Sequence, residues 1–131
     1  MAHRTIMIID DTPDHRDLLC RLLRAVGYRV LEATPGVEAL EAARRAQPDL
    51  ILMALSLPGQ PAWETVRLLR AQPALAQTPI LGATVYNTLL SRSRARSIGC
   101  VDYVDKPFDL DDLLRRITIL LPETPHSFMA A

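Results

Sequence analysis

Short apolar runs alternate with longer amphipathic stretches along the whole chain. The strand-like runs cover residues 4–9, 28–33, 49–54, 79–84 and 101–104. Apolar positions recur at the three- and four-residue spacing of helices over residues 13–26, 37–46, 63–69, 87–98 and 110–121. This alternation predicts an α/β fold in which a parallel sheet carries helices on both faces, joined by right-handed crossovers. We expect one domain over residues 1–121 and a C-terminal tail over residues 122–131.

Residues with strong capping preferences mark several of the predicted helix ends. Thr12 and Pro13 favour the N-cap and the first position of the first helix, and Gly27 favours its end. The recurring apolar residues of this helix are Leu18, Leu19, Leu22, Leu23 and Val26. Asp109 favours the N-cap of the last helix. The residues of the last helix that we expect to face inward are Leu110, Leu113, Ile117 and Leu120.

Composition narrows the class of protein. The chain has 131 residues, of which 49% are hydrophobic, so it suits one compact domain with a real core. Fifteen basic residues balance fifteen acidic ones, and the net charge therefore favours neither a nucleic-acid nor a membrane partner. No apolar run approaches the roughly 18 residues of a membrane span. The first residues lack a signal-peptide layout, so we expect a cytoplasmic protein.

The cysteines and histidines do not form a recognisable ligand motif in the sequence. Cys20 and Cys100 have no metal-binding spacing, and two small buried hydrophobic residues are the simplest interpretation. The three histidines, His3, His15 and His126, are scattered and predict no metal cluster.

Chemically active residues gather where the predicted strands end. Ligands of such sheets bind at the carboxyl ends of the strands, which here are followed by Asp10 and Asp11, Ala54, Thr84 and Lys106. Two adjacent carboxylates repel each other unless a cation offsets them. A helix-capping acid, a strand threonine and a solvated lysine would each be unremarkable alone. Because the acidic pair, the threonine and the chain's only lysine all follow strand ends, their combination favours a phosphoryl site with a divalent ion. The ion is expected to be magnesium rather than zinc.

Four motifs resemble the receiver domain of bacterial response regulators (CheY-like proteins), over about residues 4–121. They are IIDDTPD, PDLILMALSLPG, TPILGAT and DYVDKPFD. The resemblance implies a flavodoxin-like fold, a doubly wound sandwich whose parallel sheet has five strands in the order 2-1-3-4-5. It also implies a role in two-component or phosphorelay signalling.

The resemblance assigns roles to individual residues. It implies that Asp10, Asp11 and the backbone carbonyl of Ser56 are the metal site, and that Thr84 and Lys106 contact the phosphoryl group. A second set of implied roles concerns switching and docking. The switch pair is Thr84 and Tyr103, and the docking face carries Arg92, Arg96 and Tyr103 on the fourth helix and fifth strand. A cis peptide between Lys106 and Pro107 would make a tight turn before the last helix.

Ala54 departs from the family at its central position. The family has there the aspartate that accepts a phosphoryl group from a histidine kinase. A methyl group has no oxygen for that reaction, and its loss of charge would leave magnesium binding weak at best. Lys106 is then expected to pair with Asp10 or Asp11, which would otherwise remain uncompensated.

Further departures surround the same pocket. The sequence Pro61–Ala62 stands where the family commonly has Asp-Gly, and Val85 where it usually has a smaller residue. Several departures around one pocket favour natural divergence, a pseudo-receiver. An engineered phospho-dead mutant, or a fragment of an ordinary receiver, is the alternative.

The expected function is that of a stand-alone receiver-like signalling domain that is not an enzyme and requires no cofactor. The ten residues after residue 121 are too few for an output domain, and we expect the protein to act through contacts with another signalling protein or with a second copy of itself. The expected partner class is a histidine kinase, a phosphotransfer protein or an output protein, with neither nucleic acid nor membrane involved.

Three rival interpretations are weaker. A flavodoxin-type ligand-binding protein would cradle phosphate in a Gly/Ser/Thr-rich first loop, whereas Asp10 and Asp11 would repel it. A phosphatase with Asp10 as nucleophile would release phosphate steadily from acetyl phosphate. Phosphorylation of Ser56 or Asp11 would keep the family's chemistry, but Ser56 has no adjacent base.

Overall fold

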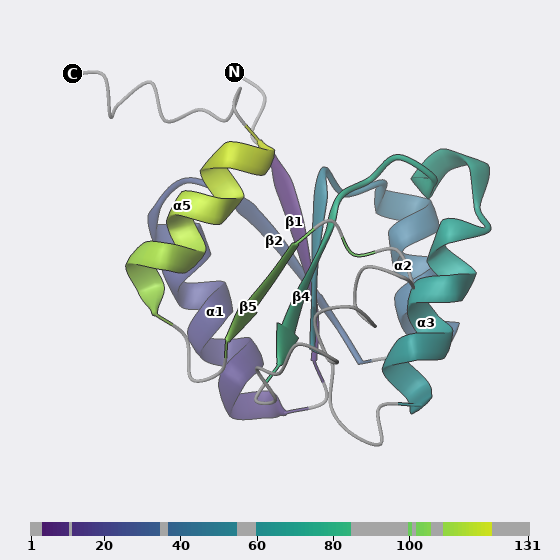
Figure 1. The fold of residues 1–131 in the computed structure, drawn as a ribbon, viewed down its shortest axis with the longest axis horizontal. Helices are drawn as coiled ribbons and strands as arrows, with labels where there is room; N and C mark the ends of the chain where they lie inside the picture. Colours follow the sequence, from purple (N-terminus) through teal and green to yellow (C-terminus); the bar gives the residue numbers. More distant parts are fainter. Residues whose placement is uncertain are drawn as a thin grey trace.

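The computed structural model describes residues 4–10, 12–34, 37–54, 60–84, 100, 102–105 and 109–121 (Figure 1). The strands are β1 (Thr5–Ile9), β2 (Arg29–Ala33), β3 (Leu50–Ala54), β4 (Ile80–Thr84) and β5 (Asp102–Asp105). The helices are α1 (Pro13–Ala25), α2 (Val37–Ala46), α3 (Gln60–Arg70) and α5 (Leu110–Leu120), with a short 3-10 turn, η1 (Pro73–Leu75). The helix that the sequence predicts over residues 87–98 and the tail over residues 122–131 lie outside the described residues.

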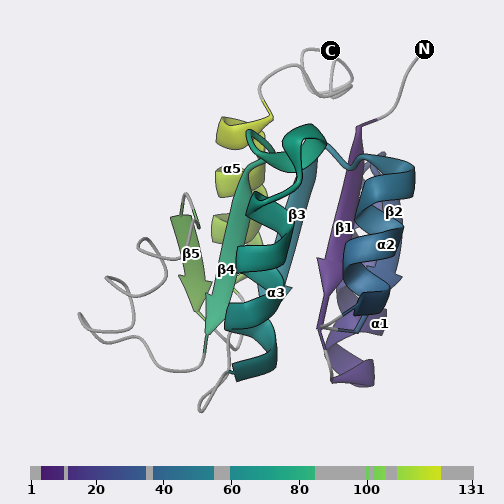
Figure 2. The same ribbon diagram turned by 90° about the vertical axis from the view of Figure 1, so that its right-hand side faces the viewer.

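The sheet has the predicted topology. Its five strands are all parallel and follow the order β2-β1-β3-β4-β5. This is the flavodoxin-like arrangement, in which the strand order reverses between β1 and β3. Figure 2, turned by 90° from Figure 1, shows the strands side by side with their helices alongside. The prediction of a doubly wound α/β fold is confirmed.

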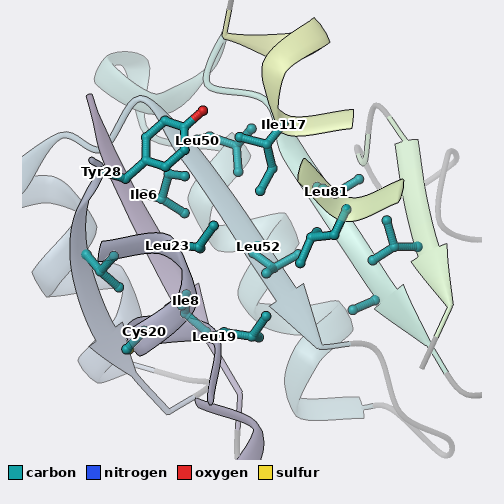
Figure 3. Close-up of a cluster of buried hydrophobic side chains, with 14 of the residues drawn as sticks. Ile6, Ile8, Leu19, Cys20, Leu23, Tyr28, Leu50, Leu52, Leu81 and Ile117 are labelled. Atoms are coloured by element: carbon teal, nitrogen blue, oxygen red, sulfur yellow. The ribbon is translucent and has the colours of Figure 1, made fainter. Parts of the chain in front are cut away.

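Helices cover both faces of the sheet. α1 and α5 lie on one face, and α2 and α3 lie on the other (Figure 1). The first face buries the cluster drawn in Figure 3, in which Leu19 and Leu23 of α1 and Ile117 of α5 all lie over the strands. The second face buries Val66 and Leu69 of α3 against the other side of the same strands. All five residues of β3 are buried, as predicted for a strand covered on both faces.

Capping chemistry explains where α1 ends and where α5 begins. Gly27 follows α1 with φ +102°, a left-handed conformation that glycine adopts without a side-chain penalty. Its N–H donates to the carbonyl of Arg24, and the N–H of Tyr28 donates to that of Leu23, both at 3.1 Å. This pair of bonds is a Schellman motif, and it confirms Gly27 as the stop signal. At α5 the predicted cap is also confirmed, because the Asp109 carboxylate accepts the Asp112 N–H at 3.1 Å.

Several local predictions were wrong. Leu110 was expected to face inward, but it is 40% exposed and does not belong to the core. Leu110 is the first residue of α5 and lies beyond the apolar cluster that holds the later residues of this helix. Helix α3 begins at Gln60, before the predicted start at residue 63, because proline is tolerated in a first helical turn. Strand β5 extends to Asp105 rather than ending at residue 104.

No helix in these described ranges combines the length and the apolar character needed to cross a bilayer.

Candidate functional site

The register of the sheet brings the strand ends together. Ile9 of β1 pairs with Met53 of β3, so the next residues along each strand, Asp10 and Ala54, lie side by side at the carboxyl edge. Ala54 in turn pairs with Ala83 of β4. The edge of the sheet therefore presents a carboxylate next to a methyl group.

The same register extends to the last two strands. Thr84 follows Ala83 in β4 and pairs with Asp105 of β5. By its backbone, Thr84 lies one residue beyond Ala54 along the edge, and Lys106 follows Asp105 in the sequence. The sequence-based grouping of strand ends thus agrees with the pairing of the strands.

Asp10 is held by the ends of two strands and by the first turn of α1. It is 2% exposed, and its N–H donates to the carbonyl of Ala33 in β2 at 3.2 Å. Its Oδ1 accepts the N–H of Thr12 at 2.8 Å. The Thr12 side chain makes no capping hydrogen bond to α1. Thr12 is therefore the N-cap by position, as predicted, but the Asp10 carboxylate engages the chain there instead.

His15 faces the other oxygen of this carboxylate. Its Nδ1 lies 3.9 Å from Asp10 Oδ2, and its side chain is 44% exposed. The sequence did not point to this contact of His15 with a carboxylate. Pro13 opens α1, so His15 is in its first turn, where side chains point back toward the N-terminal end of the helix. That direction leads to the end of β1.

Arg16 binds the backbone of Asp10. Its Nη1 donates to the carbonyl oxygen of Asp10 at 2.6 Å, and its Nε lies 3.5 Å from Glu32 Oε1 on β2. The positive charge of Arg16 is thus directed to a carbonyl and to Glu32. The sequence offered one signal for this contact, an arginine on the first turns of a helix that directly follows an acidic pair.

The two cysteines are buried thiols, as predicted. Cys20 is 1% exposed and Cys100 is 5% exposed. Burial, reinforced for Cys20 by a hydrogen bond to Glu32, raises the pKa of the Cys20 thiol to about 11. Burial raises the pKa of the Cys100 thiol to about 12. Both thiols are therefore neutral at physiological pH, and neither is suited to bind a metal ion in the folded protein.

The donor groups at this edge fit a divalent cation only in part. Asp10 supplies a buried carboxylate, whereas Ala54, 8% exposed, supplies none. Among the residues that the structure describes, no three His, Cys, Asp or Glu side chains gather as a metal-binding cluster.

Most of the other predicted site residues remain predictions. Those outside the described residues are Asp11, Ser56, Arg92, Arg96, Lys106 and Pro107, and the same is true of Val85. Thr84 and Tyr103 are placed by their backbone, in β4 and β5. Of the predicted set, the structure therefore brings together Asp10, Ala54 and the backbone of Thr84.

Comparison with known proteins identifies the family. Residues 6–118 match the family model of the response regulator receiver domain. The chain is 34% identical over 126 residues to the DNA-binding dual master transcriptional regulator RpaA of Synechocystis, covering 96% of this chain but only 52% of that protein. It is 31% identical over 114 residues to the polar-differentiation response regulator DivK of Brucella ovis, covering 87% of this chain and 93% of that protein.

Solved structures give the same result. A putative response regulator from Chloroflexus aurantiacus superposes with a TM-score of 0.85 at 29% identity, covering 93% of this chain and 100% of that one. The receiver domain of a sensor histidine kinase from Pseudomonas aeruginosa superposes with a TM-score of 0.83 at 30% identity, with the same coverage, and has a magnesium ion coordinated in its active-site cleft. With these matches and the strand order above, the chain belongs to the response regulator receiver domain family, the CheY-like signalling domains of two-component systems.

Proposed function

We propose that this domain signals through protein contacts without accepting a phosphoryl group at the end of β3. The observation that carries the proposal is Ala54, which lies beside Asp10 at the carboxyl edge of the sheet. In this family, phosphoryl transfer is expected at that edge of the sheet. The residue at the end of β3, where the acceptor would stand, is here an alanine. We therefore regard the chain as a pseudo-receiver, and not as an enzyme.

The chemistry of phosphoryl transfer supports this proposal. An acyl phosphate forms when a carboxylate oxygen attacks phosphorus and the donor leaves with the bonding electron pair. The Ala54 methyl group has no lone pair with which to attack. Asp10 is a poor substitute, because its Oδ1 is engaged by the Thr12 N–H and its carboxylate is buried.

Magnesium binding is proposed to be weak, and no cofactor to be required. Hard cations bind more tightly as the number of charged oxygen ligands rises. Asp10 and, by the family resemblance, Asp11 and the Ser56 carbonyl would remain as ligands. Ala54 removes one carboxylate from that set. The proposed pairing of Lys106 with Asp10 or Asp11 would offset their charge in its place.

We infer that the partner is another signalling protein, such as a histidine kinase, a phosphotransfer protein or an output protein, or a second copy of the chain. The docking face proposed from the family combines Arg92, Arg96 and Tyr103 with α5. On α5, Ile119 is 68% exposed and Leu110 is 40% exposed, which leaves apolar surface available for a contact. A cytoplasmic location would fit this role.

The test is phosphorylation of the wild-type protein and of Ala54→Asp. Each is incubated with acetyl phosphate and magnesium, and intact mass is measured. We expect no added phosphoryl group on the wild type. We expect one on Ala54→Asp, because the new carboxylate would lie next to Asp10 in the sheet. We also expect Ala54→Asp to bind magnesium more tightly.

Two outcomes would contradict the proposal. A labile phosphoryl group on the wild-type protein would show that another residue accepts it. The variants Asp11→Asn and Ser56→Ala would then locate that residue. Steady release of phosphate by the wild type would revive the interpretation of the chain as a phosphatase.

A further inference from the structure

We propose that helix α2 carries a self-complementary charged face through which two copies of this domain associate as an antiparallel pair. The face is formed by Glu41, Arg44 and Arg45, which are exposed on α2 (Figure 2). Because α2 and α5 cover opposite faces of the sheet, this surface is separate from the docking face proposed above. The proposed function allows a second copy as the partner, and this inference gives that copy a surface of its own.

Charged side chains on the other described helices pair within their own helix, at the three- or four-residue spacing where side chains meet. The pairs are Asp17–Arg21 on α1, Glu64–Arg67 on α3, and Asp112 with Arg115 and Arg116 on α5. On α2, Glu41 has the same spacing to Arg44 and Arg45, yet no ion pair joins them to each other or to any residue that the structure describes. The charges of α2 are therefore available to another molecule.

The arrangement of these charges selects the kind of partner. Glu41, Arg44 and Arg45 line a surface hollow of about 410 Å³. Opposite charges around one hollow favour an occupant that also carries both signs. A nucleic-acid backbone or a purely acidic peptide offers only negative charge, which Glu41 would repel. A second copy of α2 offers a guanidinium to Glu41 and a carboxylate to the arginines.

Charge is distributed along α2 in the order that an antiparallel pair requires. Glu38 and Glu41 come first, and Arg44 and Arg45 occupy the last turn. A second copy turned by 180° places its basic end against the acidic part of the first copy. A two-fold axis then makes each of these contacts twice. The dipoles of the two helices also oppose each other favourably in this arrangement.

Small side chains allow the two helices to approach closely. Ala42 lies between the acidic and the basic residues, and Ala46 is exposed at the end of the helix. A ten-residue helix is only about 15 Å long, so the contact falls below the roughly 1,200 Å² of a stable interface. We therefore expect a weak, reversible dimer that depends strongly on salt.

The experiment is sedimentation velocity of the full, tag-free chain over a range of concentrations. We expect a monomer–dimer equilibrium whose dissociation constant rises at least about tenfold between about 0.02 and 0.5 M salt. Glu41→Arg and Arg45→Glu should each weaken the dimer at least about tenfold, because each places like charges against one another. The matched control Arg21→Glu makes the same charge change on α1, on the other face of the sheet, and should leave the dissociation constant unchanged.

A mixture of the two variants gives the sharpest test. A Glu41→Arg chain paired with an Arg45→Glu chain again has opposite charges across the contact. An equimolar mixture should therefore dimerise at least about tenfold more tightly than either variant alone. Circular dichroism of each variant confirms its folding beforehand, and the salt dependence of the wild type needs no variant at all.

Several outcomes would overturn the proposal. One is a wild-type protein that stays monomeric at low salt, and another is a mixture that associates no more tightly than its components. An equal loss of association in Arg21→Glu would do the same. Stronger association in Glu41→Arg would assign the arginines to an acidic surface instead of a second α2. None of these results depends on phosphate acceptance, so the intact-mass test of the proposed function succeeds or fails separately.

Discussion

Arg16 on α1 donates a 2.6 Å hydrogen bond from Nη1 to the main-chain carbonyl oxygen of Asp10 at the end of β1. Its Nε also lies 3.5 Å from Glu32 Oε1 on β2. One side chain therefore joins the first turns of a helix to the ends of two neighbouring strands. Because Asp10 is the described carboxylate of the candidate site, this contact also orients the site.

Replacing Arg16 should destabilise the domain. Arg16→Ala removes a charge-assisted hydrogen bond to a buried residue, and such bonds contribute about 1.5–3 kcal/mol. We expect the free energy of unfolding to fall by about 2 kcal/mol, measured by urea denaturation. The matched control is Arg21→Ala on the same helix, whose pair with Asp17 is exposed and should be worth less than about 1 kcal/mol. Equal losses in the two variants would contradict this role for Arg16.

Arg70 should be more important than its neighbour Arg67. The Nη1 of Arg70 donates to the carbonyl oxygens of Leu75, Ala76 and Thr78, at 3.2, 3.1 and 2.6 Å. It thereby holds in place the segment that connects α3 to β4. Burial lowers the pKa of Arg70, although arginine remains charged at neutral pH.

We expect Arg70→Met to lower the free energy of unfolding by about 2–3 kcal/mol, because it leaves several carbonyl oxygens without this donor. Arg67→Met is the control, since Arg67 pairs with Glu64 on the exposed surface, where solvent screens the two charges and the variant should be nearly as stable as the wild type. Thermal unfolding followed by circular dichroism measures both. Equal thermal unfolding midpoints for Arg70→Met and Arg67→Met would contradict the role of Arg70 in holding the segment between α3 and β4.

Two isoleucines on α5 offer a direct test of which face of this helix is buried. Ile117 is 0% exposed and lies in the cluster shared with α1, whereas Ile119 is 68% exposed. We expect Ile117→Ala to lower the free energy of unfolding by about 2–5 kcal/mol. We expect Ile119→Ala to change it by less than about 0.5 kcal/mol. If Ile119→Ala were the more damaging change in urea denaturation, the orientation of α5 would be wrong.

The buried thiols should make stability depend on alkaline pH. The pKa of Cys100 is raised from 9.0 to about 12, so the unfolded chain loses this proton at a lower pH than the folded chain. The stabilisation is fully present below pH 9 and is lost as the pH rises from about 9 to about 12. We expect the fall in the free energy of unfolding over this range to be smaller in Cys100→Ala than in the wild type. Parallel urea titrations at several pH values measure the difference, and identical pH dependence in both would contradict the raised pKa.

The sequence predicted the fold well because its signals are local. The uniform apolar run of β3, the glycine after α1 and the aspartate before α5 each act within a few residues, and all three were confirmed. Leu110 could not be placed in the same way. A helical repeat gives the side of a helix that is apolar, but it does not show which residues extend past the edge of the sheet.

The candidate site was predictable only in part, for a related reason. Strands of equal length and matched register bring Asp10 and Ala54 together, so their proximity follows from strand order. The contact of His15 with Asp10 depends instead on how the first turn of α1 folds back over the end of β1. That direction is a property of the three-dimensional fold, and the spacing of histidines along the chain carries no trace of it.

The methyl group at the end of β3 has a thermodynamic consequence. It has no proton to release and no atom that a donor could modify, so neither protonation nor phosphorylation of this side chain can shift the balance between conformations of the domain. If the proposed function is correct, the populations of those conformations shift only when a second molecule binds one of them more tightly. Moving such an equilibrium from 1:99 to 99:1 requires a roughly 10⁴-fold preference. The abundance and selectivity of that molecule would then set the response, in place of the supply of a chemical donor.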